Sequence, residues 1–120
     1  MPRYRINNNP ERSGTATFTV GQDPATIPED YALYQNYPNP FNPETQIRYD
    51  LPEAAHVRIA IYNMRGERVV ELLNRQFDAG KHQISWNGLD ASGIPVASGL
   101  YICRLSTASF SDWKKMILIR

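Results

Sequence analysis

Residues 34–49 read YQNYPNPFNPETQIRY and place three prolines directly before a stretch in which apolar residues alternate with polar ones. Each proline lacks a backbone donor and favours an extended conformation at the residue before it. Neither a helix nor a central strand can therefore run through residues 37–43, which we name the proline segment. We expect Tyr37 and Phe41 to anchor this segment on a core, because aromatic side chains bury large apolar areas.

Downstream of the proline segment, apolar residues recur with a period of two between turn residues, as in a β-sandwich. The clearest strand runs from Thr45 to Leu51, and a hairpin turn at residues 63–66 joins the next two strands. We predict an all-β sandwich of about seven strands. Its inward positions predict a core of Ile47, Tyr49, Val57, Ile59, Ile61, Ile84, Trp86, Tyr101 and Leu105.

Size and charge limit the possible functions. The chain has 120 residues, enough for one domain with one core. Its 13 basic and 12 acidic residues leave a net charge of +1, which does not favour nucleic acid or an anionic membrane as a partner. One cysteine cannot form an internal disulfide. No apolar run approaches the roughly 20 residues that span a bilayer, so we expect no membrane insertion.

The first 30 residues differ in character from the rest. Breaker-rich stretches flank one regular segment, so we predict an N-terminal arm or linker at 1–30 and the sandwich domain at 31–120. Thr15–Val20 alternates threonine with apolar residues and predicts one strand. A lone strand is not stable in water, so it must add to a sheet of its own domain, of a lost upstream domain or of another molecule. The positions available for strand donation are Thr15, Ala16, Thr17, Phe18, Thr19 and Val20.

Few residues suggest chemistry. The carboxylates are scattered over different turns, and His56 and His82 lie on different strands, so no acid/base pair is predicted. We interpret His82 as a partly buried strand residue and Cys103 as a small core residue. The loop at 87–93 contains Asp90 and other oxygen ligands, but its spacing is not that of an EF-hand, and turn formation explains the same residues. We predict no catalytic residue, metal or cofactor, and leave weak calcium binding at this loop open.

Aromatic residues offer a second possible site. Tyr31, Tyr34, Tyr37 and Phe41 lie within a short span and could stack on sugars or peptides. A structural role is favoured for Tyr37 and Phe41, because a proline-rich stretch must be held to the sandwich. The roles of Tyr31 and Tyr34 stay open.

Several separated motifs resemble one family. Besides the proline segment they are Leu51-Pro-Glu, Ile61 to Gly66, Trp86-Asn-Gly and Ser98 to Tyr101. With them, residues 31–120 resemble the type A C-terminal sorting domains of the type IX (Por) secretion system, and the flagellar hook-cap protein has a similar domain. The resemblance implies an immunoglobulin-like sandwich without catalysis, secreted or held at the bacterial cell surface, with the outer-membrane secretion machinery as its partner.

The resemblance also implies which residues are recognised. Three motifs contribute them: the proline segment, the Gly-Leu-Tyr stretch and the C-terminus. The implied recognition residues are Pro38, Asn39, Pro40, Phe41, Gly99, Tyr101, Lys115, Met116, Leu118 and Arg120.

One departure from the family pattern gives an alternative function. A sorting domain normally follows a cargo, yet only about 30 residues precede Leu33, too few for a folded domain. Either the cargo has been cut away, so that this is a fragment or a processed form, or the module itself is the product. In the second case Thr15–Val20 of one subunit would complete a sheet in the next identical subunit and build a homopolymeric surface filament.

Overall fold

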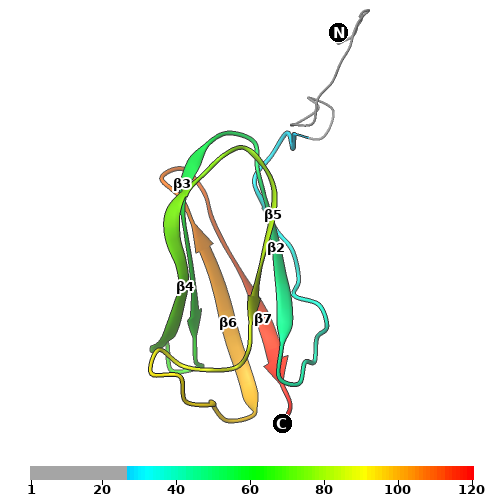
Figure 1. Cartoon of the computed structure of the whole chain (residues 1–120), viewed down its shortest axis with the longest axis vertical. Coiled ribbons are helices and arrows are strands. Elements are labelled where there is room, and N and C mark those ends of the chain that lie inside the picture. Colours follow the sequence, from blue (N-terminus) through cyan, green and yellow to red (C-terminus); the bar gives the residue numbers. More distant parts are fainter. Residues whose placement is uncertain (1–26) are drawn as a thin grey trace, which may run out of the picture.

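Two antiparallel β-sheets face each other and make up the domain (Figure 1). The computed structural model describes residues 27–120, whose regular elements are seven strands. One sheet has the order β1-β2-β5 and the other the order β4-β3-β6-β7. The alternating pattern therefore predicted the fold correctly. The strands are β1 (Ala32–Leu33), β2 (Thr45–Leu51), β3 (Ala55–Tyr62), β4 (Arg68–Phe77), β5 (Gly80–Trp86), β6 (Gly99–Ser106) and β7 (Ser111–Leu118).

The core lies between the two sheets. All of its predicted members are buried except Ile84, which is half-buried because β5 is an edge strand. Trp86 lies at the centre of an aromatic group, with its ring centroid 5.7 Å from that of Phe41 and 5.4 Å from that of Tyr101. Further buried residues are Leu33, Phe41, Leu51, Ala60, Cys103, Met116 and Leu118.

The proline segment is anchored by Phe41 but not by Tyr37. Phe41 is 2% exposed, as predicted, whereas Tyr37 is 75% exposed, so the predicted anchoring role of Tyr37 is wrong. The buried side chain of Asn36 takes that role, donating to Thr45 Oγ1 at 2.9 Å and to the Pro38 carbonyl at 3.1 Å. Successive side chains of an extended chain point to opposite sides, so the burial of Asn36 turns Tyr37 outward. All three X-Pro peptide bonds of the segment are cis.

Strand β4 carries two irregularities. The register of its pairing with β3 skips Val69 and Leu72, which are extra residues at β-bulges. Each bulge shifts the alternation by one residue. Consequently the neighbours Val69 and Val70, and likewise Leu72 and Leu73, are all half-buried against the core.

The start of the described chain lies against one end of the sandwich. Tyr31 stacks on Phe110 with ring centroids 5.0 Å apart, and its hydroxyl donates to Glu53 Oε2 at 2.8 Å. The strand predicted at Thr15–Val20 lies outside the described residues, and the boundary between arm and domain near residue 30 stays a prediction. Residues 27–120 contain no helix long and apolar enough to cross a bilayer.

Candidate recognition surface

Three segments that are far apart in the sequence meet at the end of the sandwich that holds the C-terminus (Figure 1). Phe41 lies in parallel beside Leu118 of β7. Its N–H donates to the Ile117 carbonyl at 2.9 Å, and its carbonyl accepts from the Ile119 N–H at 2.9 Å. Asn39 Oδ1 accepts from the Ile117 N–H, also at 2.9 Å. The proline segment therefore covers the free edge of β7 along this length.

The Gly-Leu-Tyr stretch at the start of β6 is the third segment. Gly99 pairs with Leu118, and Tyr101 pairs with Met116, in the ladder between β6 and β7. The Tyr101 hydroxyl donates to the Ala97 carbonyl at 2.6 Å, which fixes the turn that precedes the strand. We name residues 38–41, 99–101 and 115–120 together the terminal surface. All the recognition residues predicted from the resemblance belong to it.

Arg120 ties the C-terminus to two loops of the same end. Its Nε donates to the Val96 carbonyl at 2.6 Å, and its Nη2 donates to the Gly88 carbonyl at 2.7 Å. Its backbone N–H donates to Ser98 Oγ at 2.9 Å. A Cβ added at Gly88 would lie 2.7 Å from Arg120 Nη2 and 3.3 Å from the Pro43 carbonyl oxygen, so the guanidinium would have to shift to make room for it. The C-terminal residue is thus part of the fold.

Burial divides the predicted recognition residues into two groups. Phe41, Tyr101, Met116 and Leu118 are at most 7% exposed, so they hold the terminal surface together from inside. A partner cannot touch their side chains without opening the core. The members that a partner can reach are Pro38, Asn39, Pro40, Gly99, Lys115 and Arg120.

The structure adds exposed apolar residues that the resemblance did not name. Leu100, Ile117 and Ile119 are 41%, 38% and 50% exposed and lie among the accessible positions of the terminal surface. Tyr37, 75% exposed, lies just before Pro38. Alternation along residues 115–119 could have found Ile117, since the inward Met116 and Leu118 leave the odd-numbered residues outside. An apolar centre with a polar rim is typical of a protein-binding surface.

The groups considered for chemistry are structural. Burial raises the pKa of the Cys103 thiol from 9.0 to about 12, so it is a neutral core residue, as predicted. His82 is half-buried and stacks on Tyr49 at 5.4 Å, which also agrees with its prediction. Asp90 Oδ1 accepts from the N–H groups of Ser92 and Ile94, both at 2.9 Å, so this carboxylate forms a turn. Among residues 27–120 no three His, Cys, Asp or Glu side chains cluster as metal ligands would.

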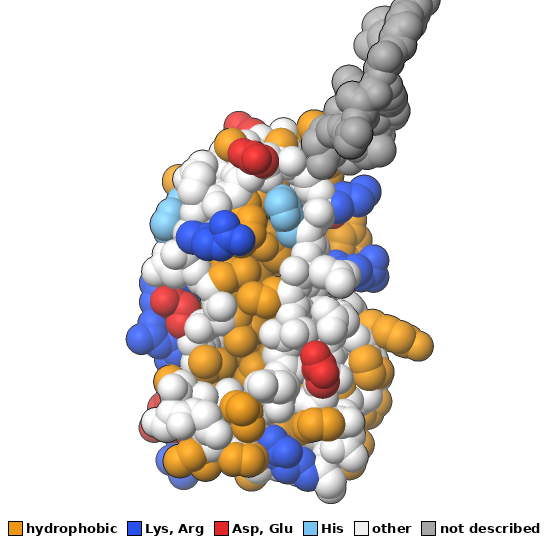
Figure 2. All heavy atoms as spheres, in the orientation of Figure 1, with side chains coloured by type: hydrophobic (Ala, Val, Ile, Leu, Met, Phe, Trp, Pro, Cys, Tyr) orange, Lys and Arg blue, Asp and Glu red, His pale blue; other side chains and the backbone are white. Residues whose placement is uncertain are grey.

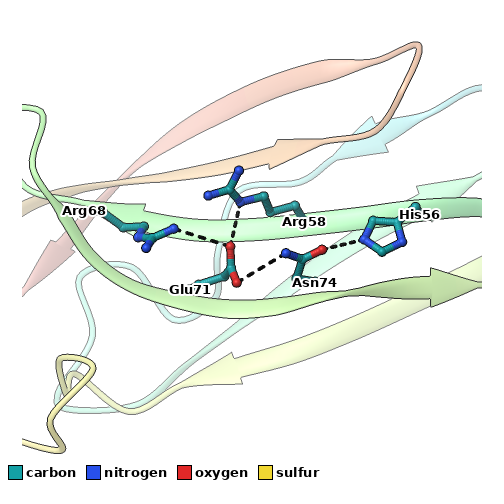
Figure 3. Close-up of polar contacts among 5 residues, drawn as sticks. All are labelled: His56, Arg58, Arg68, Glu71 and Asn74. Atoms are coloured by element: carbon teal, nitrogen blue, oxygen red, sulfur yellow. Dashed lines mark hydrogen bonds and ion pairs between the residues drawn. The ribbon is translucent and has the colours of Figure 1, made fainter.

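The outer face of the β4-β3-β6-β7 sheet carries a polar cluster (Figure 3). Glu71 accepts a hydrogen bond from Arg58 Nε at 2.6 Å and lies 3.5 Å from Arg68 Nη1. Asn74 links Glu71 to His56. The hydrogen bond from Arg58 holds the pKa of Glu71 below its ordinary value. Side chains from both β3 and β4 therefore provide the hydrogen bonds and the positive charges that pair with the Glu71 carboxylate.

An apolar groove lies on the same face. It has a volume of about 420 Å³, and Tyr62, Met64, Ile102 and Trp113 line it. Trp113 is 53% exposed, and an indole in this position can stack on a ring or an apolar side chain. Trp113 lies on the outward side of β7 because the inward side is taken by Met116 and Leu118, but this alternation gives no reason to expect a groove beside it.

Comparison with known protein families identifies the family of this domain. Residues 41–110 match the FlgD Ig-like domain family. The chain belongs to this family. The match covers more than half of the chain and contains β2 to β6 of this FlgD-type Ig-like domain. Strand β7 and most of the proline segment lie outside it, so much of the terminal surface is not covered by the family match.

Solved structures share the fold at low sequence identity. PorZ, a surface component of the type IX secretion system of Porphyromonas gingivalis, is 24% identical over 73% of this chain, with a TM-score of 0.51. Dimeric latent PorU from the same organism is 22% identical over 75%, with a TM-score of 0.55. FlgD from P. aeruginosa is 24% identical over 62%, with a TM-score of 0.50.

The chain corresponds to only part of each of these proteins. It spans 11% of the PorZ chain, 9% of the PorU chain and 58% of the FlgD chain. At these identities the similarity shows the fold alone. No curated protein sequence matches the chain.

Proposed function

We propose that this FlgD-type Ig-like domain is a non-catalytic extracellular module for type IX secretion sorting and cell-surface attachment. In this proposal the outer-membrane secretion machinery binds the accessible side chains of the terminal surface. The buried side chains of that surface stabilise its conformation. The secretion machinery would therefore bind a folded surface and not an extended C-terminal peptide.

One observation carries the proposal. The resemblance implies recognition of three stretches, the proline segment, the Gly-Leu-Tyr stretch and the C-terminus, and main-chain hydrogen bonds join them at one end of the molecule. Core packing alone does not require motifs from both ends of the domain to share one exposed patch. A common binding partner gives a reason for it.

The similar structures support the proposal through their fold. PorZ is described as an essential surface component of the type IX secretion system, and PorU comes from the same bacterium. A domain with this fold therefore occurs in two proteins of a bacterium that has a type IX secretion system. FlgD has it too, so the terminal surface, and not the sandwich, is the part that would specify sorting.

Export of a fusion protein tests the proposal. A fluorescent reporter joined ahead of the full chain is expressed in a bacterium that has a type IX system, and secreted fluorescence is measured. The double variant Lys115→Glu/Ile117→Ser changes two exposed side chains of the terminal surface. We expect secretion to fall about tenfold or more, the factor that corresponds to about 1.4 kcal/mol of lost binding.

The matched control is Arg48→Glu, on the exposed side of β2 in the other sheet. It reverses a charge without touching the terminal surface and should be secreted like the parent protein. Thermal unfolding of each purified protein checks that the fold is retained. Normal secretion of the Lys115→Glu/Ile117→Ser variant, with its fold intact, would refute the proposed sorting surface.

A filament subunit is the second candidate function. The observation that favours it is that, within residues 27–120, β5 is an edge strand whose free side can take another strand. If the chain polymerises in this way, purified full-length protein forms filaments visible by electron microscopy, and deletion of residues 1–26 abolishes them. Sedimentation of the full-length protein only as a monomer at high concentration removes this candidate.

A further inference from the structure

One side of the sandwich is open between its sheets. Within residues 27–120, β4 and β5 each have a single neighbour in their sheets, whereas the opposite side is closed by the bridge between Phe41 and Leu118. Figure 2 shows a band of hydrophobic side chains along the molecule on the open side, between β4 and β5. We name this band the seam. The half-buried hydrophobic residues of the two strands that border it are Val69, Val70, Leu72, Leu73 and Phe77 on β4 and Ile84 on β5.

The free edge of β4 is a poor template for another strand. Bulges at Val69 and Leu72 interrupt its row of backbone groups, and bulges discourage pairing at an edge. The Val69 carbonyl already accepts from the Ala91 N–H at 3.2 Å. Further along the strand, the Arg75 guanidinium lies 4.1 Å from the Phe77 ring centroid and adds a charge to β4.

The free edge of β5 has no bulge within the described residues, and its one exposed charged side chain, Lys81, lies near the start of the strand, 3.5 Å from Asp50 Oδ2. Its pairing with β2 runs without a register shift from Gly80 to Trp86. Ile84 and Trp86 point inward, while Gln83 and Ser85 are exposed and uncharged. An added strand with small polar residues on one face and apolar residues on the other would therefore continue this sheet and cover the seam.

We infer that Thr15–Val20 of the same chain adds to β5, antiparallel to it, as a further strand that closes the seam. Its six residues span about 20 Å, which matches the seven residues of β5. With Phe18 placed opposite Ile84, its apolar residues face the core. In that register its threonines lie beside Gln83 and Ser85.

The tether favours the arm of the same chain over that of a second copy. Tyr31 is fixed near Glu53 and Phe110, at the end of the sandwich where β5 begins. Passing from β1 across β2 and β5 to the next strand position takes three strand spacings, or about 14 Å. The ten residues 21–30 that separate Val20 from Tyr31 can reach about 33 Å when extended. A tethered segment that reaches its site has an effective concentration in the millimolar range, well above that of free copies in most solutions.

This placement affects the proposed sorting function without depending on it. An arm antiparallel to β5 in this register puts Ala16 opposite Trp86 and Thr15 just beyond the end of β5, at the end that carries the terminal surface. Whatever precedes Thr15 is then brought next to that surface and not to the opposite end of the module. The strand would thus set where an attached chain leaves the domain relative to its recognition residues.

A disulfide between Thr17→Cys and Ser85→Cys in the full chain tests the inference, because the proposed register makes these residues direct neighbours. Cys103 is buried and does not compete. After mild oxidation we expect a cross-linked monomer on a non-reducing gel. The control pairs Thr17→Cys with Arg58→Cys, on the outer face of the other sheet, and should stay unlinked. Cross-linked dimers or ladders would overturn the assignment to the same chain and favour the filament.

Hydrogen exchange gives a second measurement that tolerates a shifted register. Phe18→Asp removes the apolar contact with the seam and should accelerate exchange of the β5 amides, whereas Thr17→Asp, on the outward face, should change it little. Failure to cross-link together with unchanged β5 exchange in Phe18→Asp would overturn the inference. The sorting proposal would survive that result, because it is tested separately by secretion of the terminal-surface variants.

Discussion

Gly88 tests the position of Arg120 directly. Its φ is +76°, and a Cβ added there would lie 2.7 Å from Arg120 Nη2. Gly93 has a similar φ of +80°, with no atom within 4 Å of an added Cβ. Gly93→Ala should cost only the left-handed backbone penalty of about 1–2 kcal/mol, and Gly88→Ala should cost more, because the new Cβ displaces the Arg120 guanidinium and lies 3.3 Å from the Pro43 carbonyl oxygen. Chemical denaturation of the two variants measures the difference in free energy of unfolding.

The variant Arg120→Ala supplies the control for this comparison. In its background the excess cost of Gly88→Ala over Gly93→Ala should shrink, because the side chain that meets the new Cβ is gone. Equal costs for the two glycine variants in the parent protein would contradict the contact between Arg120 and the loop at residue 88.

Cys103 gives a pH prediction. Burial raises the pKa of its thiol from 9.0 to about 12, so the folded state favours the neutral form more than the unfolded state does. This contribution to stability is fully present below pH 9 and is lost as the pH rises from about 9 towards 12. We expect the free energy of unfolding to fall over that range, and to fall less in Cys103→Ala. Parallel pH curves for the two proteins would contradict this.

At the scale of single residues, the sequence predicted the core better than the surface. Alternation identified residues such as Val57 and Ile59 because a strand with one buried face fixes them locally. It failed at Tyr37, where the hydrogen bonds of Asn36 decide which side chain turns inward. Those bonds join the segment to Thr45 of the following strand. Residue type alone favours the tyrosine over the asparagine for burial.

The proline segment is the element on which the terminal surface depends. Phe41 is buried against Trp86 and Leu118, so Phe41→Ala should lower the free energy of unfolding by about 3–5 kcal/mol. The exposed Tyr37 is its matched control, and Tyr37→Ala should change stability by no more than about 0.5 kcal/mol. Urea denaturation of both variants tests this. A large loss in Tyr37→Ala would show that its side chain is not free in solution.

Regular strands could be predicted from the sequence, whereas irregular ones could not. Strand β2 coincides with the predicted segment, because turns bound it and its alternation is complete. Strand β1 has two residues, too few to show a period. In β4 the bulges hide the alternation, and their positions follow from its pairing with β3. Such features depend on contacts with other strands and do not appear in a local pattern.

At the scale of the whole molecule, the two ends of the sandwich have different roles. One end fixes the start of the described chain through Tyr31, and the other joins the proline segment to β7 and to Arg120. The resemblance named the members of the terminal surface, but not which of them are accessible. Which members are buried and which are accessible depends on the bridge between Phe41 and Leu118, because this bridge joins residues that are far apart in the sequence.

Secretion of two fusion proteins in the same type IX-competent bacterium tests the central proposal most directly. One reporter carries the full chain and the other carries residues 111–120 alone, so both contain the C-terminal residues but only the first contains the joined surface. If the partner binds the folded terminal surface, the first reporter is secreted and the second is retained. Equal secretion of the two reporters would contradict the account, because a linear C-terminal signal would then be sufficient.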